Sequence, residues 1–148
     1  MAINSPAVLS QLKTVLEGLT NMGDVQIGAP ENVSTRVGAY VSLGSRSLAR
    51  KTTGTTEGDI RFFVNFLYRL DGSTTANEET AETVLGGLVD AFFEALHSDL
   101  TLAGTVRDLI ANSLAADEPE YQLRAGKEFR EYPVIVEVKQ RGTYAVNP

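Results

Sequence analysis

The residue types most often used in catalysis and metal binding are sparse in this sequence. It has one histidine, His97, close to Asp99, and it has no cysteine. A histidine and a carboxylate can form a catalytic or metal pair, but either site needs further partners at suitable spacing. Both residues also fall at the expected end of a helix, where a histidine interacts favourably with the last carbonyl groups. We therefore interpret His97 as a helix-end residue.

Two polar stretches have compositions that resemble ligand-binding loops. The acidic residues Asp117, Glu118 and Glu120 lack the spacing of a calcium loop, so we interpret them as a solvated turn. The stretch Gly44–Gly58 is rich in Gly, Ser and Thr but contains no phosphate-binding motif. No G-x-S-x-G nucleophile elbow occurs in the chain. The sequence therefore predicts a protein that is not an enzyme, binds no metal and uses no cofactor.

The middle of Gly44–Gly58 is basic, with Arg46, Arg50 and Lys51, although the chain has 13 basic and 19 acidic residues and a formal charge of −6. The plain interpretation is a solvated hairpin tip. The alternative is a docking arm that meets an acidic partner surface. The negative charge argues against a nucleic-acid binder that neutralises phosphates, but it does not exclude a protein through which DNA passes.

Length and composition indicate one ordinary globular domain. The 148 residues are 43% hydrophobic and 22% charged, which is typical of a soluble protein, and we expect a single domain over residues 1–148. The absence of cysteine excludes disulfides and thiolate zinc sites. The first residues lack a signal-peptide pattern, and no apolar run approaches the roughly 18 residues of a membrane span. These features predict a soluble protein made inside the cell, with no membrane contact.

Apolar residues at helical spacing predict two helices. The first begins at Ser5, followed by proline, and we expect Asn21 and Gly23 to close it. The second opens at Thr75 in a capping-box pattern. Its buried stripe comprises Ala81, Val84, Leu85, Leu88, Phe92, Ala95 and Leu96. Gly86-Gly87 inside this helix costs about 1 kcal/mol per glycine relative to alanine, which predicts a close approach of the helix backbone to the sheet.

Alternating and apolar runs predict the strands. Arg36–Leu43 alternates: one face carries Val37, Ala39, Val41 and Leu43, and the other carries Arg36, Gly38, Tyr40 and Ser42. Ile60–Tyr68 is apolar on both faces, as in a central strand or one covered by a neighbouring subunit. Phe129–Lys139 is the final long strand, and Pro133, which cannot donate a ladder hydrogen bond, places it at an edge or a strand entry. Short strands are expected near Val25 and at Tyr121–Arg124.

The order of these elements predicts the fold class. Segregated helices and strands without regular alternation indicate an α+β fold, with an antiparallel or mixed sheet and two helices packed on one face. We expect Gly44–Gly58 to be a long hairpin loop or an extended β-hairpin arm, because it exceeds the usual loop length. Residues from about 140 to 148 are expected to form a flexible tail.

One long stretch, Val89–Val138, resembles a known family. An amphipathic helix runs into an L-x-G-x-V turn at Leu102–Val106, and a G-x-E-[FY]-R hairpin at Gly126–Arg130 precedes a valine-rich strand. In these motifs, and in the order of its elements, the chain resembles the tail terminator (tail-to-head joining) proteins of long-tailed bacteriophages. The resemblance implies a virion protein of the tail or neck, assembled in the host cytoplasm, and it brings no catalytic residues.

The resemblance also implies a function and partners. A ring of subunits, typically a hexamer, would cap the tail tube, end tube polymerisation and join the tail to the head. The tail tube protein and a head-completion (neck) protein would be its partners, and DNA would pass through the channel without specific binding. A charge of −6 per chain would make such a channel electronegative. The candidate assembly contacts are Arg46, Arg50, Lys51, Lys127, Glu128 and Arg130.

Other functions remain open at this point. Related head-tail neck proteins share the size and layout of the terminators, so another neck component is an alternative to the terminator. A monomeric or dimeric binding module of non-viral origin could use the basic loop for an anionic partner, and salt-sensitive binding would distinguish it. A small-molecule enzyme ranks third, and it would require turnover that depends on His97 or Asp99.

Overall fold

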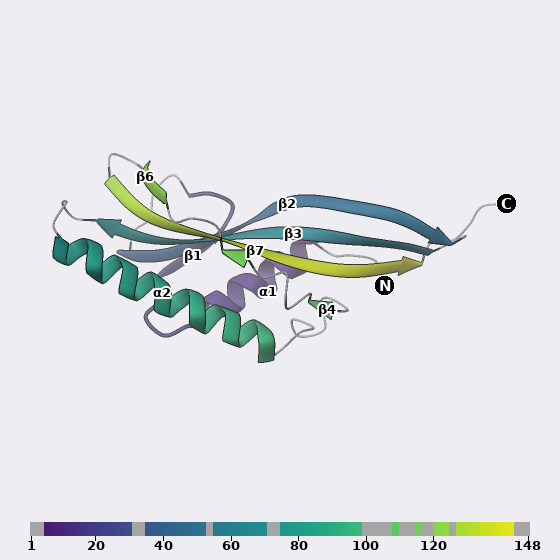
Figure 1. Cartoon of the computed structure of the whole chain (residues 1–148), viewed down its shortest axis with the longest axis horizontal. Helices are drawn as coiled ribbons and strands as arrows, with labels where there is room; N and C mark the ends of the chain where they lie inside the picture. Colours follow the sequence, from purple (N-terminus) through teal and green to yellow (C-terminus); the bar gives the residue numbers. More distant parts are fainter. Residues whose placement is uncertain are drawn as a thin grey trace.

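Two helices cover one face of a twisted sheet, and three strands extend past both helices as an arm (Figure 1). This computed structural model describes residues 5–30, 35–52, 55–70, 75–98, 108–109, 115–116, 120–124 and 127–143. Side chains are described within residues 5–30, 35–44, 60–70, 78–98 and 127–138. The predicted α+β class, with a mixed sheet, two helices on one face and an extended hairpin arm, is confirmed.

The sheet combines one parallel strand with antiparallel neighbours. The elements are α1 (Ser5–Glu17), β1 (Asp24–Ile27), β2 (Val37–Thr52), β3 (Thr55–Leu70), α2 (Thr75–Ser98), β4 (Asp108–Leu109), β5 (Ala115–Ala116), β6 (Glu120–Arg124) and β7 (Lys127–Thr143). Neighbouring strands follow the order β1-β2-β3-β7-β4, and β5 and β6 also pair with β7. Strand β1 runs parallel to β2, whereas the other described pairs are antiparallel. Strand β3 is central, as its two apolar faces predicted.

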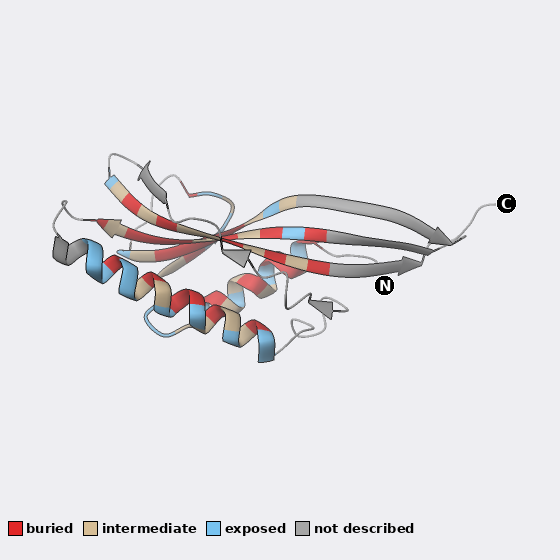
Figure 2. Cartoon of the chain, in the orientation of Figure 1, coloured by how far each residue is buried: buried red, intermediate tan, exposed pale blue. Residues whose placement is uncertain are grey.

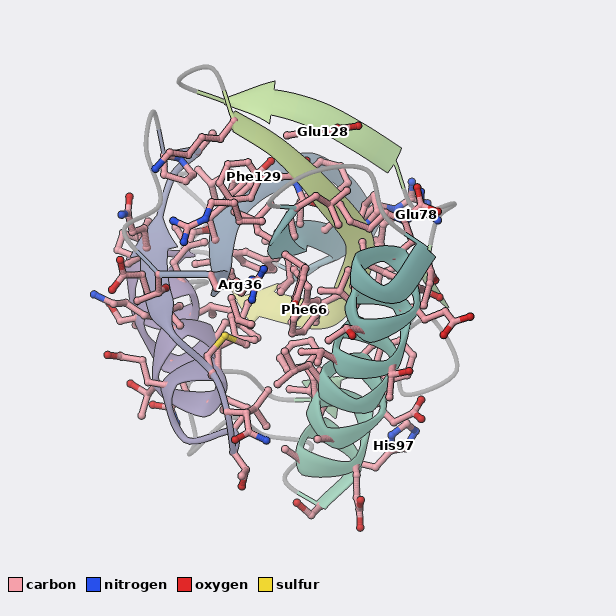
Figure 3. The ribbon with its side chains drawn as sticks, turned by 90° about the vertical axis from the view of Figure 1, so that its left-hand side faces the viewer. Arg36, Phe66, Glu78, His97, Glu128 and Phe129 are labelled. Atoms are coloured by element: carbon pink, nitrogen blue, oxygen red, sulfur yellow. The ribbon has the colours of Figure 1, made fainter. Side chains whose placement is uncertain are left out.

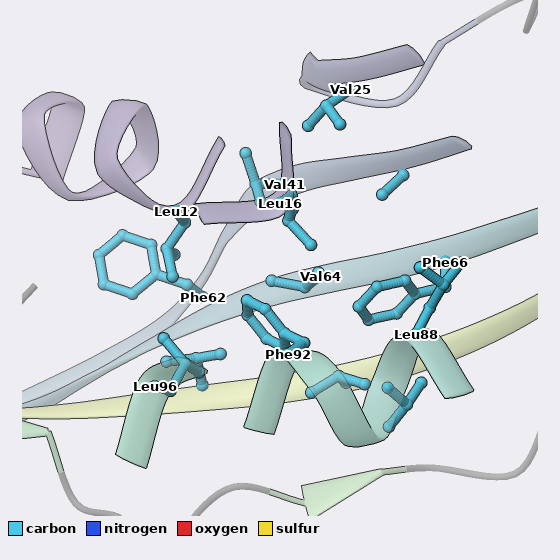
Figure 4. Packing of buried hydrophobic residues seen from close by; sticks show 14 of the residues in the cluster. Leu12, Leu16, Val25, Val41, Phe62, Val64, Phe66, Leu88, Phe92 and Leu96 are labelled. Atoms are coloured by element: carbon cyan, nitrogen blue, oxygen red, sulfur yellow. The ribbon is translucent and has the colours of Figure 1, made fainter. Parts of the chain in front are cut away.

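The core lies between the helices and the sheet (Figure 2). Seen along the long axis, both helices lie on one side of the sheet, and Phe66 of β3 points between them (Figure 3). The rings of Phe66 and Phe92 meet edge to face, with centroids 5.6 Å apart and an interplanar angle of 68° (Figure 4). The helices contribute Val8, Leu9, Leu12, Leu16, Ala81, Leu85, Leu88, Val89, Phe92 and Leu96. Most of the predicted α2 stripe is therefore buried, and Val89 joins it.

A second, smaller cluster lies on the opposite face of the sheet. It comprises Tyr40, Leu67 and Phe129, all less than 10% exposed. Because side chains alternate along a strand, Leu67 faces away from the helices that cover Phe66 and Tyr68. Both faces of β3 therefore bury apolar surface within the subunit.

The turn after α1 differs from the sequence prediction. The helix ends at Glu17, before the predicted closing residues Asn21 and Gly23. Asn21 takes a positive φ of 67° in the turn that follows. Gly23 instead allows a close approach of two backbone segments, because a Cβ there would lie within 3.0 Å of the Val37 carbonyl oxygen and the Thr35 side chain. The Thr35 hydroxyl joins these segments by donating to the Val37 carbonyl at 2.6 Å and accepting from the Asp24 N–H at 2.9 Å.

Replacing Gly23 by alanine is expected to lower the free energy of unfolding by about 2–3 kcal/mol, because the new methyl group overpacks against a backbone oxygen that cannot move independently. Urea denaturation followed by circular dichroism measures this change. Gly18→Ala is the matched control, since a Cβ there makes only ordinary contacts at 3.5 and 3.6 Å and should change stability by less than about 1 kcal/mol. Equal effects of the two substitutions would contradict the assigned role of Gly23.

The stretch predicted as a long loop is mostly strand. Residues of Gly44–Gly58 continue β2 to Thr52 and begin β3 at Thr55, and the two strands pair as far as Thr52 and Thr55. Residues 53–54 lie outside the described range. The loop interpretation rested on the lack of apolar side chains in this stretch. It is wrong because neighbouring strands satisfy the backbone hydrogen bonds of the stretch, so it forms strands without a buried face. The final strand β7 likewise extends to Thr143, so a tail from about 140 is wrong for residues 140–143.

Two residues of the long strands lie where the pairing of the sheet changes. Leu43 shares the face of β2 that carries Val41, as predicted, but its side chain is 54% exposed. Between Leu43 and Arg46 the pairing advances three residues on β2 but two on β3, and such a bulge bends the strand at the point where it leaves the core. Strand β7 as a whole is not an edge strand, because β3 pairs with one side of it and β4, β5 and β6 pair with the other. On its other side, Pro133 falls between the residues of β7 that pair with β5 and those that pair with β6.

Candidate assembly interface

The residues whose chemistry the sequence raised fall only partly within the described structure. His97 is exposed at the end of α2, and its Nδ1 lies 2.7 Å from the Phe93 carbonyl oxygen, which agrees with the predicted helix-end role. Asp99, Asp117, Glu118 and the L-x-G-x-V motif lie outside the described residues. Within the described part of the chain, no three His, Asp or Glu side chains gather as metal ligands. None of the helices in that part is long and apolar enough to cross a membrane.

The predicted basic contacts Arg46, Arg50 and Lys51 all lie on the arm. We define the arm as Gly44–Thr52 of β2, Thr55–Asp59 of β3 and Lys139–Thr143 of β7. It projects beyond both helices, and at roughly 3.3 Å per residue its β2 portion is about 30 Å long (Figure 1). The arm therefore carries backbone and charge away from the core.

The arm is basic in an acidic chain. It contains five basic and two acidic residues, a net charge of +3, whereas the whole chain carries −6. The sequence interpretation missed Lys139 and Arg141 of this set, because it ended the last strand at Lys139. Their signal was the pair of basic residues two positions apart, Lys139 and Arg141, directly after the valine-rich run of the last strand. In the sheet, Asp59 is paired in register with Lys139, and Glu57 with Arg141, so the acidic positions of β3 lie beside basic ones.

The two edges of β2 differ along the arm. One edge pairs with β3, but on the other β1 covers only Gly38–Val41. None of the described strands pairs with the outer edge of β2 from Ser42 to Thr52. A strand edge with unpaired N–H and C=O groups is a template for pairing with another chain. This edge is therefore a surface suited to assembly.

The other predicted contacts lie at the opposite end of the β3–β7 ladder. Lys127 is exposed and Glu128 is partly exposed, beside the residues 125–126 that are not described. Arg130 has an intramolecular role, since its Nε donates to Glu82 Oε1 at 2.8 Å and its side chain is 16% exposed. The structure thus separates the six predicted contacts into two groups and ties Arg130 to α2. A surface ion pair of this kind stabilises by less than about 1 kcal/mol.

The comparisons with known proteins found likenesses among solved structures. No protein-family model matches the chain, and no curated protein matches it. Among solved structures, the fold is similar to the PVC sheath/tube terminator of an extracellular contractile injection system, determined by cryo-EM in the extended state. The TM-score is 0.39 at 12% sequence identity, over 100% of this chain and 62% of that chain. This chain therefore spans less than two thirds of the length of the protein that it matches.

Proposed function

We propose that this protein is a structural component of a tail-like assembly and that it forms a ring that caps a tail tube. The observation that carries the proposal is the basic arm, along which none of the described strands pairs with the outer edge of β2. The residue-level resemblance to phage tail terminators supports the same function. The ring ends tube polymerisation and presents a surface for joining to the head or neck.

In the proposed ring, two different surfaces of neighbouring subunits are in contact. A contact between unlike surfaces of identical subunits propagates head to tail and closes into a ring when the rotation permits. The arm reaches a neighbouring subunit or the tube, with its basic residues facing acidic surface. We propose six subunits, the tail tube protein and a head-completion protein as partners, a place in the virion, and a channel that DNA crosses without specific binding. No step of this function requires catalysis or a cofactor.

A second candidate is a monomeric module that binds an anionic partner through the arm. The concentration of positive charge on the arm favours it. Binding of this kind weakens as salt rises, because exposed charges are screened over about 10 Å at 0.1 M salt. A neck component other than the terminator would share the ring but would not stop tube growth.

The mass of the purified protein by light scattering, followed by negative-stain imaging with and without tail tubes, tests the proposed function. We expect rings in solution or at tube ends, together with tubes that stop growing. A monomer that ignores tubes but binds an anionic surface with strong salt dependence would overturn the ring and favour the binding module. Rings that leave tube growth unchanged would favour another neck component.

A further inference from the structure

Two glycines in the middle of α2 make no close contact with the described part of the chain. Gly86 and Gly87 each cost about 1 kcal/mol in a helix interior, and the sequence predicted that they allow close approach to the sheet. That prediction is wrong, because a Cβ built on either glycine meets no atom within 4 Å. Within the described residues, the absence of a side chain at these positions therefore serves no contact.

Gly87 borders a hollow between α2 and the turn after α1. The hollow has a volume of about 490 Å³ and is open to solvent. Leu19, Val84, Leu88 and Ala91 contribute apolar surface to it, and at Gly87 the helix backbone is bare. We call this hollow the α1–α2 groove. A partner side chain can approach the helix backbone at Gly87 more closely than any other residue type there would allow.

The rim of the α1–α2 groove is acidic. Glu79, Asp90 and Glu94 are exposed and share the helical row that contains Gly87, and Glu17 is exposed at the end of α1. Helix α2 contains five acidic residues and no lysine or arginine. Lys13 is the one basic residue of α1. The groove therefore suits an apolar group that is accompanied by positive charge.

Another part of the same chain has this combination. Ile27 and Leu43 are the exposed large hydrophobic side chains of the described residues, at 48% and 54% exposure. Ile27 pairs in register with Val41, and Leu43 lies two residues further along β2 on the same face. We call these two residues the β1–β2 patch. The nine positions of β2 after the patch include Arg46, Arg50 and Lys51 and no acidic residue.

We propose that the β1–β2 patch of one subunit docks into the α1–α2 groove of a second copy of this chain. Apolar side chains enter the groove, the bare backbone at Gly87 admits them, and the basic strand that follows crosses the acidic rim. The patch and the groove are different surfaces, so this contact is heterologous and repeats around a ring. The inference rests on the proposed ring and names the contact that builds it.

Cross-linking tests the docking directly, because the chain has no cysteine. Leu43→Cys and Ala91→Cys are made separately, mixed, and treated with a short bifunctional maleimide. We expect a covalent dimer from the mixture, and a ladder of higher species from the double variant. The matched control replaces Ala91→Cys by Glu78→Cys, an exposed position of α2 outside the groove, and should yield at least five-fold less product.

A pair of glycine variants gives an independent measurement. Gly87→Leu fills the groove, whereas Gly86→Leu adds the same side chain to the same helix away from the residues that line it. Both should raise the melting temperature of the subunit through helix propensity. Only Gly87→Leu should weaken self-association, at least ten-fold by light scattering or analytical ultracentrifugation.

The outcomes separate the docking from the proposed function. If rings form but Leu43→Cys and Ala91→Cys do not cross-link, and if Gly87→Leu does not weaken the rings, the docking is overturned and the proposed ring stands. A cross-linked dimer that never closes into a ring would support the docking and reject the ring. The absence of both association and cross-link, at concentrations up to the solubility limit and with tubes present, would overturn both.

Discussion

Replacing Phe92 by alanine is expected to lower the free energy of unfolding by about 3–5 kcal/mol, the cost of deleting a fully buried aromatic side chain. Phe92 is 0% exposed, and its ring packs edge to face on Phe66 of β3. It therefore anchors α2 to the centre of the sheet (Figure 4). For a chain of this size, about 2–4 °C per kcal/mol predicts a fall in melting temperature of roughly 10 °C. Urea denaturation and a thermal scan measure both quantities.

The neighbouring residue provides the control. Phe93 is only partly buried and lies beside Phe92, with ring centroids 6.4 Å apart, so Phe93→Ala should cost about 1–2 kcal/mol. Phe92→Leu keeps most of the volume and should recover at least half of the loss. If Phe92→Ala cost no more than Phe93→Ala, α2 would not be held to the sheet by this contact.

Shortening the arm is expected to abolish tube capping while the core stays folded. Residues Leu48–Gly58 are replaced by Asn-Gly, a two-residue turn that joins Ser47 to its register partner Asp59. The buried core side chains that the structure describes all lie outside the deleted segment. The melting temperature should therefore change by only a few degrees. The concentration of protein that halves tube elongation should rise at least ten-fold, as measured from tube lengths in negative stain.

Charge and backbone contributions of the arm can be distinguished. A variant with Arg46, Arg50 and Lys51 changed to glutamine keeps the length of β2 and removes its positive charge. If charge steers the arm, this variant should cap tubes less well at low salt. Its capping should also depend much less on salt than that of the unaltered protein. If the outer edge of β2 pairs with a partner strand, it should retain most of its capping. Normal capping by the shortened arm would reject a function for the arm altogether.

Local patterns predicted those elements whose stability comes from a buried face. The apolar stripes of α1 and α2, and the apolar residues on both faces of β3, each require burial against another element. The spacing of the apolar residues predicts which face is buried. The capping residues Ser5 and Thr75 marked the first residue of each helix correctly. His97 was correctly interpreted as a helix-end residue, because a lone histidine that lacks further metal ligands or catalytic partners has few other functions.

Patterns that depend on pairing partners could not be resolved in this way. Gly44–Gly58 has few apolar residues, so its strands are defined by hydrogen bonding to distant segments, including residues 139–143 of β7. The candidate contacts show the same limit of sequence reasoning. The charged residues could be named from the sequence, but their position on one arm depends on the pairing of distant strands. The ion pair of Arg130 with Glu82 also joins residues far apart in the chain.

The amino-acid sequence alone thus determined the fold class, the helices, the central strand and the basic character of residues 46–51, because each follows from local spacing and composition. The tertiary structure alone decided that these basic residues lie on a three-stranded arm with an outer β2 edge to which none of the described strands pairs, that Leu43 is exposed, and that Gly87 borders a groove. Register, edges and grooves arise from the relative placement of distant segments, and that placement is set by the packing of the whole chain.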